Sequence, residues 1–170
     1  MLKPQDILVA LKAHELDEWT IRAMAESLSL STGEVHNALK RVDESGIFSR
    51  ESRLISPQPF VSVLRGIRHV YFVKPGPLVR GIPTAHSAAP LAEQIRSDDD
   101  VFVWEHPEGD VRGQAIEPLY PIVPEVALSD GSMYEWLNLI EGIRIGGPRV
   151  QRIALDRIRD RLGLTREEAG

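Results

Sequence analysis

The stretch LSLSTGEVHNALKRVDESG, residues 28–46, decides how the first third of the chain is expected to fold. Ser31 followed by Glu34 is the capping-box pattern that starts a helix, and Gly46 is typical of the position after a last helical turn. Apolar residues recur between them at helical spacing: Val35, Ala38, Leu39 and Val42. The stretch therefore predicts a helix over 31–45 with one apolar side and one polar side.

The polar side of this predicted helix carries residue types that contact bases and phosphates. It consists of Ser31, Thr32, Gly33, His36, Asn37 and Lys40, with Arg41 at its flank. Asparagine can make a paired hydrogen bond to adenine, and lysine or arginine can contact guanine or phosphate. A glycine allows close backbone approach, and free N–H groups at a helix start suit a phosphate. An ordinary solvated helix face is the alternative for these residues.

Two more helices and a hairpin are predicted around this helix. Pro4 begins an apolar repeat that predicts a helix over about 4–14, and Thr20 caps a short second helix. IFSRESRLIS, residues 47–56, predicts a small hairpin with two basic residues near its tip, Arg50 and Arg53. Three helices followed by a basic hairpin is the element order of a winged helix-turn-helix.

AESLSLSTGEVHNALKRVDESGIF resembles the core of bacterial winged helix-turn-helix regulators of the MarR-like kind. The positions that match are Ala25, Leu28, Leu30, Ser31, Val35, Ala38, Leu39, Gly46 and Ile47. Val42 departs from the pattern, which more often has Leu there. The resemblance covers about residues 4–56, a third of the chain. It implies that the third helix reads the DNA major groove and that the hairpin contacts the backbone or the minor groove.

Residues 57–170 are expected to form a small mixed α/β domain that ends in two helices, so the fold class is α+β. The expected elements are a helix starting at Ser56-Pro57, a strand at 70–73, a hairpin of VFVWE and VRGQAI, and helices near 132–145 and 148–162. Breaks by Pro and Gly predict an irregular segment over 78–90, and Pro118, Pro121 and Pro124 predict an extended one. The domain boundary is placed between residues 56 and 57.

The segment RGIPTAHS, residues 80–87, is the candidate ligand or partner surface of this second domain. Its polar residues are Arg80, Thr84, His86 and Ser87. Loops on a rigid scaffold often carry binding. The alternative is a buried connection in which these side chains satisfy backbone groups.

Composition excludes several other classes. The chain has 170 residues, 42% hydrophobic, without cysteine or a long apolar run, which predicts a cytoplasmic protein with no thiolate chemistry and no membrane span. No HExxH, GxSxG, Walker A or GxGxxG motif occurs. We therefore expect no enzyme, no metal and no cofactor. The net charge is −5, but residues 1–70 balance nine Lys/Arg against nine Asp/Glu.

These features together predict a sequence-specific transcriptional regulator that binds double-stranded DNA. Its second domain would sense a small-molecule effector or mediate assembly, and the wide apolar stripe of 148–162 favours a homodimer. An antitoxin is the alternative: the winged helix would regulate its own operon and the second domain would neutralise a partner toxin. A deep polar pocket that held His86 and His106 together would instead favour an enzyme or a ligand sensor.

Overall fold

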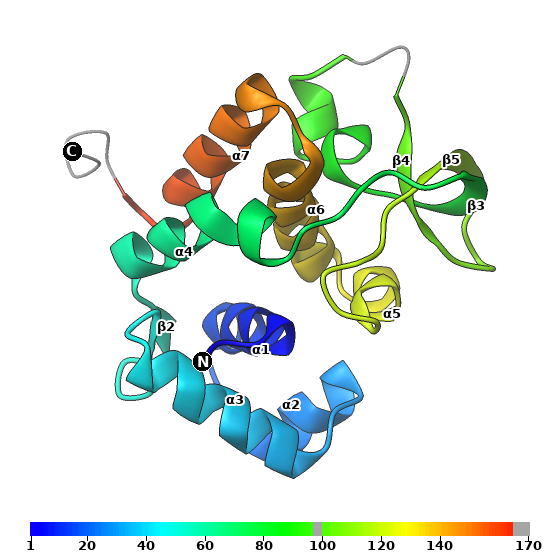
Figure 1. The fold of residues 1–170 in the computed structure, drawn as a ribbon. Coiled ribbons are helices and arrows are strands. Elements are labelled where there is room, and N and C mark those ends of the chain that lie inside the picture. The colour runs from blue at the N-terminus through cyan, green and yellow to red at the C-terminus, as the bar shows by residue number, and fades with distance from the viewer. Residues whose placement is uncertain (97–99, 165–170) are drawn as a thin grey trace.

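A computed structural model describes residues 1–96 and 100–164. Within those residues the chain is an α+β protein with seven α-helices, two short 3₁₀ helices and two small sheets (Figure 1). The α-helices are α1 (Pro4–Glu15), α2 (Ile21–Leu28), α3 (Thr32–Glu44), α4 (Pro57–Val70), α5 (Val123–Ser129), α6 (Gly131–Ile145) and α7 (Pro148–Arg161). The strands are β1 (Phe48–Ser49), β2 (Leu54–Ile55), β3 (Leu78–Pro83), β4 (Phe102–Glu105) and β5 (Val111–Ala115). The 3₁₀ helices are η1 (Ala85–Ser87) and η2 (Leu91–Glu93).

Local capping signals set the limits of the first helices, as the sequence predicts. Thr20 Oγ1 accepts a hydrogen bond from the Ala23 N–H at 3.0 Å and starts α2. Ser29 adopts a left-handed conformation, with φ of 49°, and ends that helix. Gly46, with φ of 78°, follows the end of α3. The helices predicted at 4–14 and 31–45 are confirmed to within about a residue at each end.

The hairpin predicted over 47–56 is also confirmed. β1 and β2 pair antiparallel with Phe48 opposite Ile55. The hairpin is tied to α1, because the Ile55 N–H donates to His14 Nδ1 at 3.1 Å. Burial lowers the pKa of His14, which favours the neutral ring that this hydrogen bond requires. The base of the hairpin is therefore held beside the first helix.

The second sheet differs from the prediction. β4 and β5 form at the expected residues, but they pair parallel and not as a hairpin, with Phe102 opposite Gln114. The segment predicted to be irregular supplies β3, which runs antiparallel to both and closes a three-stranded barrel. Gly81 pairs with Glu105 and also with Val111, so the β4–β5 connection crosses over β3 at this glycine. The hairpin prediction was wrong because β4 and β5 run parallel and each also pairs antiparallel with β3.

Two further predictions were wrong. The strand expected at 70–73 does not form: α4 continues to Val70, and the next strand, β3, begins only at Leu78. The segment of 118–124 is not all extended, since α5 begins at Val123 with Pro124 in its first turn. A proline is tolerated there because the first N–H groups of a helix have no intrahelical partner.

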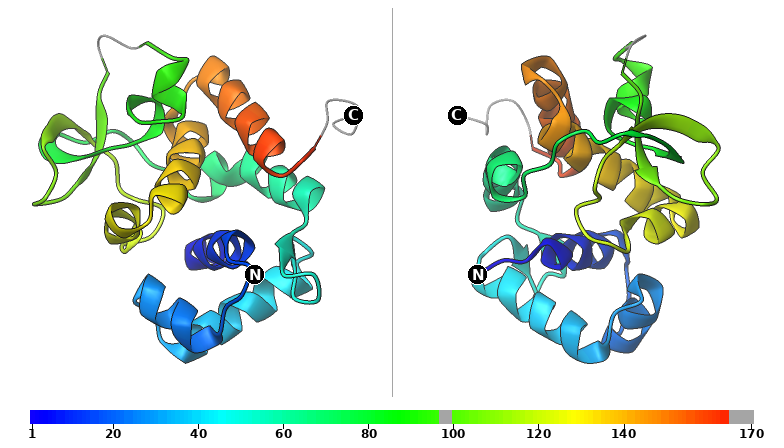
Figure 2. Two further views of the ribbon diagram at one scale, coloured as in Figure 1. Left: turned by 180° about the vertical axis from the view of Figure 1, so that it is seen from behind. Right: turned by 45° about the vertical axis from the view of Figure 1, so that its right-hand side comes forward.

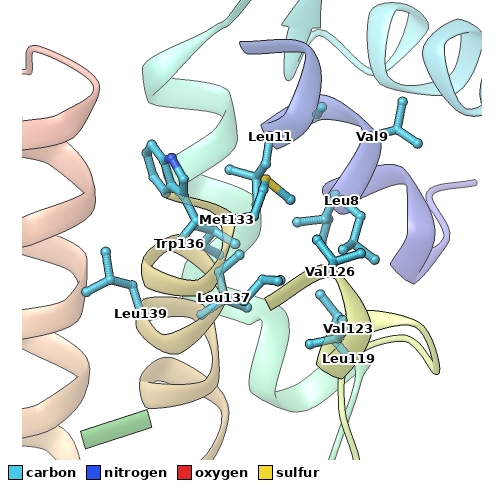
Figure 3. Close-up of a cluster of buried hydrophobic side chains, with 14 of the residues drawn as sticks. Leu8, Val9, Leu11, Leu119, Val123, Val126, Met133, Trp136, Leu137 and Leu139 are labelled. Atoms are coloured by element: carbon cyan, nitrogen blue, oxygen red, sulfur yellow. The ribbon is translucent and has the colours of Figure 1, made fainter. Parts of the chain in front are cut away.

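One continuous hydrophobic cluster joins the two parts of the chain (Figure 3). The side chains of α1 pack on α5 and α6; the labelled members include Leu8, Leu11, Val123, Val126, Met133, Trp136 and Leu137. Polar contacts border this cluster. Glu15 accepts hydrogen bonds of 2.6 Å from the Trp136 indole and from the Ser132 hydroxyl, and Lys12 pairs with Asp130 at 2.6 Å. The first three helices are therefore fixed on the remainder of the protein.

The helix α6 lies at the centre of the molecule, between the three-stranded sheet on one side and α4 with α7 on the other (Figures 1 and 2). The helix α7 contacts α6, α4 and η2, and buries Ala154 and Ile158 completely. The wide apolar stripe predicted for 148–162 is thus occupied largely within the same chain. Among the described residues, no helix combines the length and the apolar character that a bilayer span requires.

Candidate nucleic-acid interface

The outer face of α3 is polar and exposed to solvent. The exposed residues on this face are Ser31, Thr32, Gly33, His36, Asn37 and Lys40. The opposite side packs on α1 and α2 and is fully buried at Val35, Ala38, Leu39 and Val42. Because the buried side fixes the orientation of the helix, the polar residues present one continuous surface to the solvent. This is the arrangement that the sequence predicts for them.

The capping box is present at the start of α3, and it affects anion binding there. Ser31 Oγ accepts from the Glu34 N–H at 3.1 Å, and Glu34 Oε2 accepts from the Ser31 N–H at 2.7 Å. Hydrogen bonding to Ser31, mainly from its backbone, lowers the pKa of Glu34, so the carboxylate is charged at neutral pH. That negative charge opposes a phosphate at this helix end. Ser31 therefore has a capping role in the structure.

Arg41 is bound within the protein and does not extend from the outer face of α3. Its guanidinium donates two hydrogen bonds of 2.8 Å to the carboxylate of Asp6 on α1, which has no exposed area. Asp6 also accepts from the Lys3 N–H at 2.8 Å. The hydrogen bond with Asp6 raises the pKa of Arg41. We therefore assign Arg41 to the α1–α3 contact and remove it from the expected DNA contacts.

Lys40 remains available on the outer face. Its ammonium lies 3.8 Å from Glu44, and the two side chains are 62% and 63% exposed. An exposed pair of this kind contributes only about 0.3–0.5 kcal/mol. A phosphate can therefore displace Glu44 at little cost. Arg22, on α2, is similarly exposed and pairs with Glu26 at 3.3 Å.

The hairpin tip presents two arginines in different settings. Arg50 is exposed, and its backbone N–H donates to Asp43 at 3.0 Å. Arg53 has a left-handed conformation with φ of 59°, and its guanidinium lies 5.0 Å from the ring centre of Trp19. Trp19 and Arg53 line an open cavity of about 490 Å³ next to the start of α2. Trp19 was not among the site residues predicted from the sequence, although it is an aromatic residue directly before the N-cap Thr20.

The four polar residues of the second candidate surface, within 80–87, do not form one common surface. Thr84 is fully buried and donates to Asn138 Oδ1 at 3.0 Å, and Ser87 Oγ accepts from the Phe102 N–H at 2.9 Å. Both residues thus have the structural role given as the alternative. Arg80 is exposed on β3 and does not line the cavity that contains His86.

His86 and Ser87 line a cavity of about 400 Å³ together with Arg96 and Asp100. Burial lowers the pKa of His86, and its ring packs edge-on to Phe102 at 5.0 Å. His106 does not line this cavity; its Nε2 lies 3.2 Å from Glu125. The pocket that would have favoured an enzyme, with both histidines, is therefore not formed. Within residues 1–96 and 100–164, no group of three or more His, Asp or Glu side chains is placed to hold a metal ion.

No family model, curated protein or solved structure matches this chain. The function is therefore argued from the residues and their geometry.

Proposed function

We propose that residues 1–56 form a winged helix-turn-helix that binds double-stranded DNA, and that the protein is a transcriptional regulator. The observation that carries this proposal is the outer face of α3, which is polar and exposed while the opposite side is fully buried. The β1–β2 hairpin, with Arg50 and Arg53, follows α3 directly in the chain. In this proposal α3 enters the major groove and the hairpin contacts the DNA backbone.

The contacts divide into two kinds. Asn37 hydrogen-bonds to an adenine, and His36 lies beside it on the same face. Lys40 contacts a phosphate, and Gly33 leaves space for the backbone of the DNA. Phosphate contacts fix the orientation on the duplex, whereas the base contact selects the sequence.

A homodimer is part of this proposal because the available positive charge is small. The proposed surface has three cations free of strong partners, Lys40, Arg50 and Arg53, and Glu34 and Glu44 lie on the same face of α3. A single copy would make few phosphate contacts and bind weakly. Two copies related by a twofold axis would double these contacts and read two half-sites one helical turn apart.

Substitution of Asn37 by alanine tests the base contact. We expect the affinity of Asn37→Ala for the DNA upstream of its own gene to fall roughly tenfold to a hundredfold, because one bidentate base contact is lost. Its stability should be unchanged, since Asn37 is exposed. Fluorescence anisotropy at two salt concentrations, with a scrambled competitor, measures the effect. The exposed Gln94, which directly follows η2, is changed to alanine as the control.

Two outcomes would contradict this function. If the wild-type protein binds no duplex at low salt, the three helices and the hairpin are a protein-docking module, and a partner is sought by pull-down. If Asn37→Ala binds the upstream and scrambled sequences as the wild type does, α3 does not read bases.

The hairpin arginines are tested through the salt dependence of binding. Each phosphate contact contributes about 0.9 to the slope of log K against log salt concentration. We expect Arg50→Gln and Arg53→Asn each to reduce the slope by about one; asparagine is chosen at residue 53 because it tolerates the left-handed backbone. Arg112→Gln, an exposed arginine on β5, is the control. An unchanged slope in both hairpin variants would exclude the hairpin from the DNA contact.

A further inference from the structure

A cavity lined by three arginines lies away from α3, in a groove between α4 and α7. Its volume is about 400 Å³. Arg65 lines it from α4, and Arg152 and Arg159 line it from α7. Of the residues that the structure describes, no aspartate or glutamate lines this cavity. The two helices contact each other and lie on the same side of α6 (Figures 1 and 2).

The positive charges in this groove are only partly compensated. Arg159 pairs with Asp156 at 3.2 Å, and Asp156 is itself 54% exposed. Within residues 1–96 and 100–164, the side chains of Arg65 and Arg152 form no hydrogen bond and no ion pair. Three guanidinium groups around one cavity repel one another, and an anion between them would relieve that repulsion.

The backbone around the groove is held in place by hydrogen bonds and close packing. The Gly146 carbonyl accepts from Gln151 Nε2 at 2.6 Å and from Arg68 at 3.5 Å, which joins the α6–α7 turn to α4. A Cβ on Gly146 would lie 2.5 Å from Val150 Cγ1 of α7, so the end of α6 and the first turn of α7 are in close contact. The arginines are thus carried by helices with a fixed separation.

The groove also has an apolar part. Leu155 and Pro148 line it from α7, and Ile143 lines it from α6. A surface that only tracks a phosphate backbone would not need this apolar lining. A volume of about 400 Å³, apolar walls and a few charged groups are the properties of a small-molecule site.

We propose that the α4–α7 groove binds a small organic anion. Its phosphate or carboxylate group lies between Arg65 and Arg152, where guanidinium groups donate paired hydrogen bonds to planar or tetrahedral anions. Its apolar body lies on Leu155 and Pro148. Binding of this anion does not require DNA.

A regulatory role for this site rests on the proposed function. The helix α4 begins at Pro57, two residues after β2 ends, so it connects the groove to the hairpin. An anion that bridges α4 and α7 would favour one position of α4 and therefore of the hairpin. The groove would then be the effector site of the regulator.

The test is a titration of the ¹⁵N-labelled full chain with three probes, followed by NMR. Phenyl phosphate has both an anionic group and an apolar ring, inorganic phosphate has only the first, and phenol has only the second. We expect phenyl phosphate to shift the amide signals around Arg65, Arg152 and Leu155 saturably and to bind more tightly than either other probe. Arg65→Gln and Arg152→Gln should each weaken its binding about tenfold, and Arg112→Gln, the control on β5, should not.

Several results would overturn the proposal. One is that the amide shifts are scattered over the surface. Another is that phenol or inorganic phosphate binds as tightly as phenyl phosphate. A third is that Arg112→Gln weakens phenyl phosphate binding as much as Arg65→Gln and Arg152→Gln do. Displacement of phenyl phosphate by a random-sequence duplex, with a duplex affinity that depends on Arg152, would show that the groove contacts DNA instead. The two proposals fail separately: Asn37→Ala should lose specific DNA binding and keep the phenyl phosphate titration unchanged.

Discussion

Gly81→Ala is expected to destabilise the protein by about 3 kcal/mol, because the added methyl group has no space. A Cβ at Gly81 would lie 2.0 Å from the Trp104 carbonyl oxygen, and a Cβ at Gly109 would lie 2.2 Å from the Gly81 carbonyl carbon. Both neighbours are backbone atoms in or beside paired strands, so they cannot move without breaking strand pairing. Urea unfolding followed by circular dichroism measures the loss.

Gly66→Ala is the matched control for this substitution. Gly66 lies within α4, and a Cβ there would meet no atom within 4 Å. Since alanine is the better helix former, this variant should be as stable as the wild type or more stable by up to about 1 kcal/mol. Equal stability of Gly81→Ala and the wild type would mean that the chain does not cross over β3 at this residue.

Arg41→Ala should destabilise the protein by roughly 2 to 3 kcal/mol, because it leaves the Asp6 carboxylate buried without its charged partner. The expected loss is below that of a fully buried pair, since the Arg41 side chain is 22% exposed and water can reach the site. Lys40→Ala, one residue earlier, is the control and should change stability by less than about 0.5 kcal/mol. Thermal or urea unfolding of both variants compares them.

A double-mutant cycle separates the pair from its surroundings. Asp6→Asn, Arg41→Gln and the double variant should give a coupling free energy of at least about 1 kcal/mol, because the two side chains share two hydrogen bonds. Additive effects would show that the pair does not join α1 to α3. If Arg41→Ala binds DNA less well, the cause should be its lower stability. Lys40→Ala should lose DNA binding while it remains folded.

The parts of the fold that the sequence predicted are those determined by neighbouring residues. The N-cap at Thr20 and the capping box of Ser31 with Glu34 act over three residues, and both are present. Ser56-Pro57 correctly predicted the start of α4, and the helices near 132–145 and 148–162 formed as expected. In each case the signal and the structure that it specifies lie within one or two helical turns.

The predictions that failed depended on partners far along the chain. Nothing near VFVWE and VRGQAI shows that both will pair with β3, because that pairing joins Gly81 to residues more than twenty positions away. Arg41 has the spacing of a surface residue, but its partner Asp6 is 35 positions away. Thr84 reaches Asn138, 54 positions away. Composition and periodicity contain no information about such contacts.

The same limit applies to the candidate sites. The residues of the α3 face could be named from the sequence because helical spacing alone places them together. The α4–α7 groove could not, since Arg65 and Arg152 come from helices that are separated in the chain by the whole three-stranded sheet. Only the packing of both helices on α6 brings their charges to one cavity.

The packing of α1 limits how this protein can be divided. The side of α1 that carries Leu8 and Leu11 is covered by α5 and α6, while its other contacts hold α2 and α3 (Figure 3). A fragment of residues 1–56 grafted onto a foreign domain would expose that apolar side to water and would leave Glu15 and Lys12 without Trp136 and Asp130. A working chimaera therefore has to carry α5 and α6 along with the fragment, so the smallest transplantable unit is larger than residues 1–56.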